Sequence, residues 1–295
     1  MPQPGLAVKH EKNSDRVGLS DEEFIQLRDL IHERTGIFLE ARRKMSMENA
    51  VMERLREQKL NSCFEYYYTL RFGDSKEWDY LISKLIIPET RFFRNVPLWH
   101  ALEQDILPQI IELKRASHQY TLNIWSAGCS TGEEAYTLAM LVCKVIPDPQ
   151  SWNIKIWGGD ICKLSLAKAL QGIYEERSMV EMTEADKARF FENTKGHFIV
   201  NQSVRKYVTF ESQNLIEIEK LESLPQMDII ICANVMMYFS ETARNRLLEF
   251  FSKKLNSDGY LFTGWAEILD VHKTPFTLKF LRGAMCYQLE RGQKT

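Results

Sequence analysis

The chain has 295 residues, of which 44% are apolar, 26% charged and 11% aromatic, a globular composition that excludes disordered, collagen-like and coiled-coil classes. Its 38 Lys and Arg residues are balanced by 40 Asp and Glu residues, and the net charge of −2 argues against nonspecific nucleic-acid binding. The longest apolar stretch, Met227 to Phe239, contains Asp228 and Asn234 and is shorter than the roughly 20 residues that a bilayer span needs.

The N-terminal segment is polar, contains two early prolines and lacks the apolar core of a signal peptide, so we predict a mobile tail at residues 1–18. Cysteines occur at positions 63, 129, 143, 162, 232 and 286, with no CxxC pair and no nearby His at metal-ligand spacing. The sequence therefore does not support a metal site, and we expect buried, reduced thiols in a cytosolic protein.

Residues 19–88 have a helical pattern and predict a small helical domain. Ser20 and Glu23 have the spacing of a capping box, apolar residues follow every three to four positions, and Gly36 is placed to end the first helix. A second helix is predicted from about Arg42 to Lys59, and it carries six basic residues against three acidic ones. This segment is basic within a nearly neutral protein.

From Pro97, which is well placed to open a helix, predicted strands and helices alternate. Strands are predicted at 122–126, 154–158, 227–232 and 259–263, and helices at 132–146, 164–169 and 241–255. This order implies right-handed crossovers and an α/β fold with a doubly wound parallel sheet. Segments 278–281 and 285–289 predict an antiparallel hairpin at one edge. Residues at about 179–213 break the alternation, and we predict a small insertion with strands at 196–200 and 205–210.

The loop after the first predicted strand has the sequence AGCSTGEE at residues 127–134. Glycines such as Gly128 permit a tight turn and close approach to a ligand, and Ser130 and Glu133 have capping-box spacing. The loop departs from GxGxxG and lacks the lysine of a nucleoside-triphosphate loop. Glu133 and Glu134 already supply the negative charge that a helix N-terminus favours, so the site suits a cation. Spacing alone does not choose between these two acids.

Further polar residues follow two other predicted strands. S-adenosylmethionine carries an ammonium group and a ribose, and Asp160, at the end of the second strand, is placed to bind the ribose. Taken singly, each acid can also be a helix cap or a solvated loop charge. Asn234 and Tyr238 follow the strand at 227–232 and form either a hydrogen-bonded core pair or one wall of the ligand site. Their position at a strand end favours the wall.

Several dispersed motifs resemble the CheR family of chemoreceptor protein-glutamate methyltransferases over about residues 19–290. The motifs are Thr90-Arg91-Phe92-Phe93-Arg94, STGEE at 130–134, Gly159-Asp160-Ile161, Gln213-Asn214-Leu215, Asn234 to Phe239, and Gly264-x-x-Glu267. The resemblance implies a Rossmann-like methyltransferase sheet in a domain at 89–295, a helical N-terminal domain at 19–88 that contacts the receptor, and a β-subdomain inserted at about 179–213. In some family members this β-subdomain docks a C-terminal receptor peptide.

The resemblance further implies an S-adenosylmethionine site, with S-adenosylhomocysteine as the product. Together with Gly128, the residues that it places around the cofactor are Thr90, Arg94, Glu134, Asp160, Asn214, Leu215 and Asn234. Glu134 would bind the amino group and Asp160 the ribose hydroxyls. The implied reaction is methylation of glutamate carboxylates on the cytoplasmic helices of a methyl-accepting chemotaxis protein, without metal, nucleic acid or membrane insertion.

Arg94 and Tyr238 are the candidates for catalytic roles. Arg94 would orient the incoming carboxylate through a forked hydrogen bond, and Tyr238 would close one wall beside the methyl group. Alternatively, Arg94 is a structural cation paired with Glu89 or Glu134.

Receptor methylation helices are acidic, so the basic second helix is a candidate receptor-binding surface. Its candidate residues are Arg42, Arg43, Lys44, Arg54 and Arg56. The alternative is a solvated helix face. The sequence departs from the family pattern at three places, namely Pro88, Ala233 and the pair Trp265-Ala266. The alternative functions are methylation of a small molecule or RNA, and a non-catalytic module that binds the cofactor or a receptor.

Overall fold

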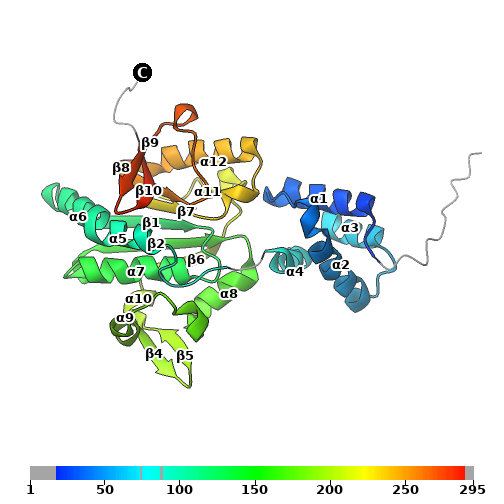
Figure 1. Cartoon of the computed structure of the whole chain (residues 1–295), viewed down its shortest axis with the longest axis horizontal. Coiled ribbons are helices and arrows are strands. Elements are labelled where there is room, and N and C mark those ends of the chain that lie inside the picture. Colours follow the sequence, from blue (N-terminus) through cyan, green and yellow to red (C-terminus); the bar gives the residue numbers. More distant parts are fainter. Residues whose placement is uncertain (1–17, 74, 87–88, 290–295) are drawn as a thin grey trace, which may run out of the picture.

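A helical domain precedes an α/β domain in the computed structural model, which describes residues 18–73, 75–86 and 89–289 (Figure 1). The tail expected at the N-terminus, up to residue 17, and Pro88 lie outside the described residues. Within these residues, no helix is long and apolar enough to cross a bilayer.

The helical domain begins as the capping pattern predicts. Ser20 accepts a hydrogen bond from the Glu23 N–H, the Glu23 carboxylate accepts one from the Ser20 N–H, and Gly36 ends the helix in the left-handed conformation. The helices are α1 (Asp21–Thr35), α2 (Lys44–Gln58), α3 (Cys63–Phe72) and α4 (Ser75–Leu85), with a 3-10 turn at Ala41–Arg43. Their buried apolar side chains continue into the core of the α/β domain.

The predicted doubly wound sheet is confirmed. Its strands are β1 (Thr121–Ala127), β2 (Asn153–Asp160), β6 (Val208–Ser212), β7 (Met227–Cys232), β8 (Leu255–Thr263), β9 (Phe276–Leu281) and β10 (Ala284–Leu289). The order across the sheet is β6-β2-β1-β7-β8-β10-β9. The first five strands in this order, β6, β2, β1, β7 and β8, run parallel. The C-terminal hairpin, β9 and β10, adds antiparallel strands at one edge, as predicted.

Helices cover both faces of this sheet. They are α5 (Val96–Ala101), α6 (Leu107–Ala116), α7 (Glu133–Val145), α8 (Lys163–Gln171), α11 (Ile218–Leu221) and α12 (Glu241–Lys254), with a π-helical turn at Leu102–Ile106. Further 3-10 turns lie at Pro149–Ser151, Glu176–Ser178, Met236–Tyr238 and Val271–Lys273.

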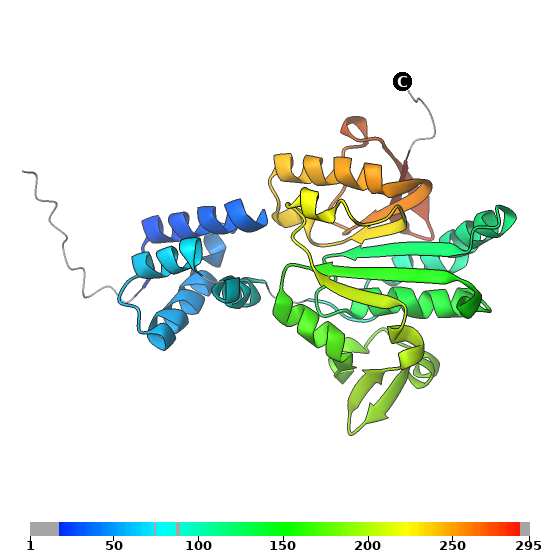
Figure 2. The same cartoon turned by 180° about the vertical axis from the view of Figure 1, so that it is seen from behind.

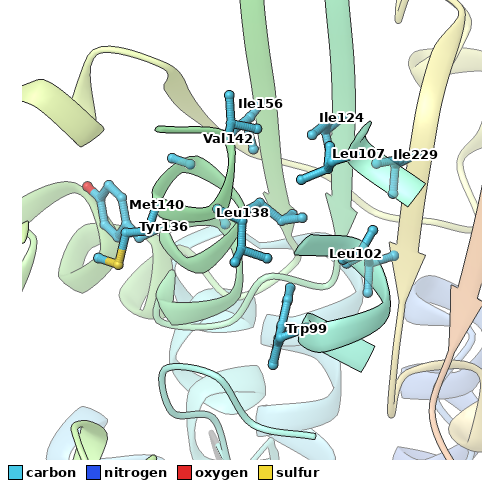
Figure 3. Packing of buried hydrophobic residues seen from close by; sticks show 14 of the residues in the cluster. Trp99, Leu102, Leu107, Ile124, Tyr136, Leu138, Met140, Val142, Ile156 and Ile229 are labelled. Carbon is cyan, nitrogen blue, oxygen red and sulfur yellow. The ribbon is translucent and has the colours of Figure 1, made fainter. Parts of the chain in front are cut away.

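Alternating side chains of β1 divide the core into two layers. Ile124 belongs to the buried cluster that contains Leu138 and Val142 of α7 on one face of the sheet, and it lies beside Leu107 in Figure 3. Trp125, the next residue, points to the other face, where its ring meets Phe251 of α12 at a centroid distance of 5.4 Å. This period-two alternation is the reason that the strand is held between two helical layers.

The strands of the predicted insertion differ from those of the structure: the strand at 196–200 matches, but the strands at 173–174 and 191–194 were not predicted. A small antiparallel sheet contains β3 (Ile173–Tyr174), β4 (Phe191–Thr194) and β5 (His197–Val200), accompanied by α9 (Glu184–Phe190) and α10 (Gln202–Arg205). The segment predicted as its second strand, 205–210, instead supplies β6, which pairs with β2 of the main sheet. That part of the prediction was wrong, because a short β-forming sequence does not specify its partner strand.

Candidate functional site

The carboxyl ends of the parallel strands meet at one end of the sheet, and the candidate site residues follow these strands. This end faces the helical domain, whose helices α1 and α4 lie beside it in both views (Figure 1, Figure 2). Asp79 of α4 forms an ion pair with Lys163 of α8 at 3.1 Å. The site is therefore bordered by both domains.

The glycine-containing loop after β1 packs against the end of β2. The N–H groups of Gly128 and Cys129 donate to the Gly159 carbonyl at 2.8 and 2.9 Å. Gly128 has φ of 97°, and a Cβ atom there would lie 2.4 Å from the Cγ2 atom of Val235. Only glycine permits this close approach between the loop after β1 and the loop after β7.

The capping box predicted at the start of α7 was wrong. Gly132, with φ of 96°, is the N-cap residue, and no side chain caps the helix. Ser130 instead adopts φ of 51° and donates its backbone N–H to Asp160 Oδ2 at 2.8 Å. The buried Glu133 carboxylate accepts hydrogen bonds from Thr131 and from Ser178. Glu133 is thus occupied by hydroxyl groups of the protein itself.

Glu134 is the acid that remains for a ligand. It is half-buried, and Ser126 donates its hydroxyl to Glu134 Oε1 at 2.6 Å. Burial raises the pKa of Glu134 to about 7, although the Ser126 hydrogen bond and the charge of Arg94 oppose the rise. A carboxylate that burial destabilises in this way gains most from a bound cation.

Asp160 is held in one orientation by backbone donors. Oδ1 accepts the Cys162 N–H and Oδ2 accepts the Ser130 N–H, each at 2.8 Å. Burial raises the pKa of Asp160, while the N–H groups of Cys162, Ser130 and Ile161 act in the opposite direction. A carboxylate has about four lone-pair sites, so after these N–H groups the Asp160 side chain still has room to accept a ribose hydroxyl group.

The segment after β6 joins the site to the helical domain. Asn214 donates its side-chain amide to the Arg34 carbonyl of α1 at 2.8 Å, while Leu215 is buried. Asn214 also borders a cavity of about 300 Å³ between the two domains. The preceding Gln213 is buried and accepts a hydrogen bond from Trp125 Nε1 at 2.9 Å.

The loop after β7 exposes both of its candidate residues. Asn234 is exposed and left-handed, with φ of 60°, and the Tyr238 side chain is about half exposed. The Tyr238 carbonyl accepts the Phe38 N–H of the helical domain at 2.8 Å. These two residues do not form a buried core pair, which leaves the ligand-wall interpretation.

Glu267 is a site-forming residue whose role sequence reasoning did not identify. Its buried carboxylate accepts the N–H groups of Asn234 and Gly264 at 2.7 Å and of Met237 at 2.9 Å. It therefore joins the loop after β7 to the loop after β8. The signal that could have revealed this role was the GxxE motif that directly follows the predicted strand at 259–263.

Arg94 is half-buried and only loosely paired. Its guanidinium donates to the Glu89 carbonyl, and its Nη2 atom is 3.9 Å from the exposed Glu89 carboxylate. An exposed pair at this distance contributes little stability. Its charge also opposes the rise that burial causes in the pKa of Glu134. Thr90 lies half-buried in the same segment.

The five basic residues predicted to bind the receptor differ in how far the rest of the helical domain engages their side chains. Arg54 is committed to the fold, because its guanidinium contacts the buried Glu77 carboxylate at 2.6 Å and lies 4.3 Å from the centroid of the Tyr80 ring. Arg43 donates to a backbone carbonyl, and Lys44 pairs with an acid of α1. Arg42 and Arg56 are exposed, and Arg42 forms an exposed ion pair with Glu40 at 2.8 Å. The five residues thus do not form one uniform surface.

Comparisons with known proteins agree with these features. Residues 22–86 match a family described as "CheR methyltransferase, all-alpha domain", and residues 88–284 match "CheR methyltransferase, SAM binding domain". Chemotaxis protein methyltransferase 2 of Vibrio cholerae is 28% identical, over 92% of this chain and 94% of its own length. The chemotaxis protein methyltransferase of Escherichia coli is 32% identical, over 94% of each chain. That of Borreliella burgdorferi is 30% identical, over 91% of this chain and 95% of its own.

Proposed function

The chain belongs to the CheR methyltransferase family, and we propose that it uses S-adenosylmethionine to methylate glutamate side chains of chemoreceptor cytoplasmic helices for adaptation in chemotaxis. The observation that supports this most directly is Glu134, whose only hydrogen-bond donor among the described residues is the neutral Ser126 hydroxyl. A pKa of about 7 makes this carboxylate a ready partner for a cation.

The residues present fit the cofactor. Glu134 would bind its ammonium group, and Asp160, oriented by backbone donors, would accept its ribose hydroxyls. We propose that six further residues line the cofactor, namely Thr90, Arg94, Gly128, Asn214, Leu215 and Asn234. When bound, S-adenosylmethionine supplies a sulfonium methyl group that a carboxylate oxygen can accept while the C–S electron pair remains on sulfur.

The chain's own residues then act mainly by positioning. A glutamate side chain has a reference pKa of about 4.3, so the acceptor is already ionised at neutral pH and needs no general base. Arg94 would orient this carboxylate and offset its repulsion by Glu134 and Asp160. Tyr238 would form the wall beside the transferred methyl group. Catalysis would come from orientation and exclusion of water.

The test is methyl transfer from labelled S-adenosylmethionine to receptor cytoplasmic fragments. We expect label in the receptor that alkali releases as volatile methanol, which identifies a methyl ester. Label in RNA or in a small molecule instead would assign another methyltransferase activity. Cofactor binding without transfer to any of these acceptors would identify a non-catalytic regulator.

Tyr238 provides a test of the wall. We expect Tyr238→Phe to keep turnover within about twofold of wild type, and Tyr238→Ala to lose about tenfold or more, because the ring rather than the hydroxyl contacts the methyl group. Turnover numbers with saturating receptor and cofactor measure both effects. A large loss in the phenylalanine variant would show that the hydroxyl takes part in the reaction.

Arg42 and Arg56 provide a test of receptor steering. We expect Arg42→Glu/Arg56→Glu to raise the KM for receptor about fivefold at low salt, because two exposed attractive charges become repulsive. The difference from wild type should shrink as salt screens these charges, while cofactor binding stays constant. A KM equal to that of wild type would show that Arg42 and Arg56 are solvated surface residues without a role in receptor binding.

Arg54 is the matched contrast on the same helix. Arg54→Ala leaves the buried Glu77 carboxylate without its cation, and breaking such a pair costs about 3–5 kcal/mol of unfolding free energy. Urea unfolding measures this loss. A stable Arg54→Ala variant with weakened receptor binding would return Arg54 to the receptor-binding surface.

A further inference from the structure

The rim of the proposed reaction site carries large apolar side chains that nothing in the described chain covers. Met237, in the loop after β7, is 53% exposed. Trp265 and Ile268, in the loop after β8, are 65% and 64% exposed. Grouped exposed apolar side chains of this size mark interaction sites more often than do isolated ones.

The two loops form one unit because Glu267 joins them. Its carboxylate accepts the N–H of Met237 at 2.9 Å and that of Asn234 at 2.7 Å, while its own N–H donates to the Gly264 carbonyl. Trp265 and Ile268 lie close to Glu267 in sequence. The hydrogen bonds of Glu267 to the loop after β7 therefore bring Met237, Trp265 and Ile268 to one region.

The exposure of Trp265 and Ile268 follows from a fixed backbone. Glu267 and Leu269 are buried between and beside them, and the Leu269 N–H donates to the buried Tyr287 hydroxyl at 3.0 Å. The Glu267 carbonyl also accepts the Thr263 hydroxyl at 2.8 Å. With these contacts made, the loop presents its other side chains outward, and its backbone needs no further ordering for a partner.

We propose that Met237, Trp265 and Ile268 form an apolar platform that receives apolar side chains of the methylated receptor helix, next to its target glutamate. This inference rests on the proposed function and names the recognition surface of the same site. The platform is continuous with that site, because Met237 immediately precedes Tyr238 and shares its loop with Asn234. On a helix, residues three and four positions from the glutamate lie about 5–6 Å away on the same face.

The platform and the exposed Arg42 and Arg56 would contribute differently to binding. Exposed charges such as Arg56 mainly accelerate encounter and lose their effect in salt. Apolar anchors, tryptophan above all, slow dissociation and are insensitive to screening. The apolar sequence around a glutamate, rather than its charge alone, would then decide whether the residue is methylated.

The test compares Trp265→Ala/Ile268→Ala with Phe280→Ala, which removes an equally exposed apolar side chain from β9. We expect the platform variant to raise the KM for receptor roughly tenfold, at low and high salt alike, with turnover number and cofactor dissociation constant unchanged. The Phe280→Ala control should match wild type. Trp265→Phe should recover most of the loss from Trp265→Ala.

Three results would overturn the platform. The first is wild-type KM in the double variant, and the second is a parallel loss of cofactor binding, which would indicate a structural role. The third is a wild-type dimer in sedimentation that Trp265→Ala dissociates without changing receptor kinetics, which would assign the surface to contact between copies. In all three, wild-type protein still methylates the receptor. If wild type transfers no methyl group to any receptor fragment, the proposed function itself fails.

Discussion

Replacing Glu134 with glutamine should weaken cofactor binding by about 100-fold, which corresponds to about 2.7 kcal/mol. The carboxylate is half-buried and would be the direct partner of the cofactor's ammonium group, and removing one member of such a pair leaves the other charge poorly solvated. Glutamine retains an oxygen that can accept the Ser126 hydroxyl, so the fold should survive. Titration calorimetry with S-adenosylhomocysteine measures the change.

The adjacent acid is the control for this substitution. Glu133 accepts hydrogen bonds from Thr131 and Ser178, so Glu133→Gln keeps an acceptor in place and should alter the cofactor dissociation constant by less than about threefold. Equal losses in the two variants would show that charge near the start of α7, rather than a contact by Glu134, binds the cofactor.

The pKa of Glu134 adds a signature in pH. Because burial raises this pKa to about 7 in the cofactor-free protein, the group is largely neutral at pH 6 and largely ionised at pH 8. A bound ammonium favours the ionised form, so affinity should fall by up to about tenfold per pH unit below pH 7, with release of a proton on binding. Calorimetry at pH 6 in buffers of different ionisation enthalpy detects that proton. Glu134→Gln should abolish this component.

The same shift affects stability with a definite sign. The folded-state pKa lies above the unfolded value of 4.5, so the cofactor-free fold loses stability from this group as pH rises from about 4.5 to 7. A cation beside Glu134 offsets the loss. The rise in melting temperature caused by cofactor should therefore be larger at pH 7.5 than at pH 6.

Arg94→Ala should lower the turnover number by about 100-fold, the scale of effect expected when a reacting group loses its orientation. The guanidinium donates to the Glu89 carbonyl through Nη1, but its ion pair with the Glu89 carboxylate is long, so its other N–H groups stay available. It is thus free to form a two-pronged hydrogen bond with an incoming carboxylate. Arg94→Lys should recover only part of the rate, since an ammonium group cannot reproduce the planar fork.

Arg91→Ala is the matched control. Arg91 belongs to the same segment, but its guanidinium pairs with Glu181 at 2.9 Å, and its loss should leave turnover near wild type. Single-turnover measurements with cofactor pre-bound separate the chemical step from binding. A wild-type single-turnover rate in Arg94→Ala would remove Arg94 from the chemistry and leave it a cofactor ligand at most.

Much of the fold was predictable because its signals are local. The apolar strand at 227–232 and the amphipathic helix at 241–255 each carry a period that specifies their type, and their alternation specifies a parallel sheet. The partner of β6 was not predictable, since pairing with β2 depends on the rest of the sheet. The side-chain cap of α7 was mispredicted because Ser130 and Gly132 are both left-handed, and Gly132 rather than Ser130 is the N-cap residue.

For the site, the sequence indicated acids after the first two strands of the sheet, but not the groups that hold the site residues in place. Asp160 was expected at a strand end, yet the two N–H groups that orient it are visible only in three dimensions. Arg54 has the same charge as Arg56, and nothing local distinguishes them, because Glu77 reaches Arg54 from another helix. The hydrogen bonds of Glu267 to Asn234 and Met237 likewise join residues about thirty positions apart in sequence.

The segment from the last turn of α1 to Phe38 limits how this protein could be re-engineered. Arg34 and Phe38 bond through their backbones to Asn214 and Tyr238, which lie on two different loops of the catalytic domain. A chimera that borrows the helical domain of a relative to change receptor choice would have to reproduce the backbone path of this segment. Exposed side chains of α2 such as Arg56 can be exchanged without that constraint, so surface grafting would test the proposed receptor contact without disturbing the boundary between the domains.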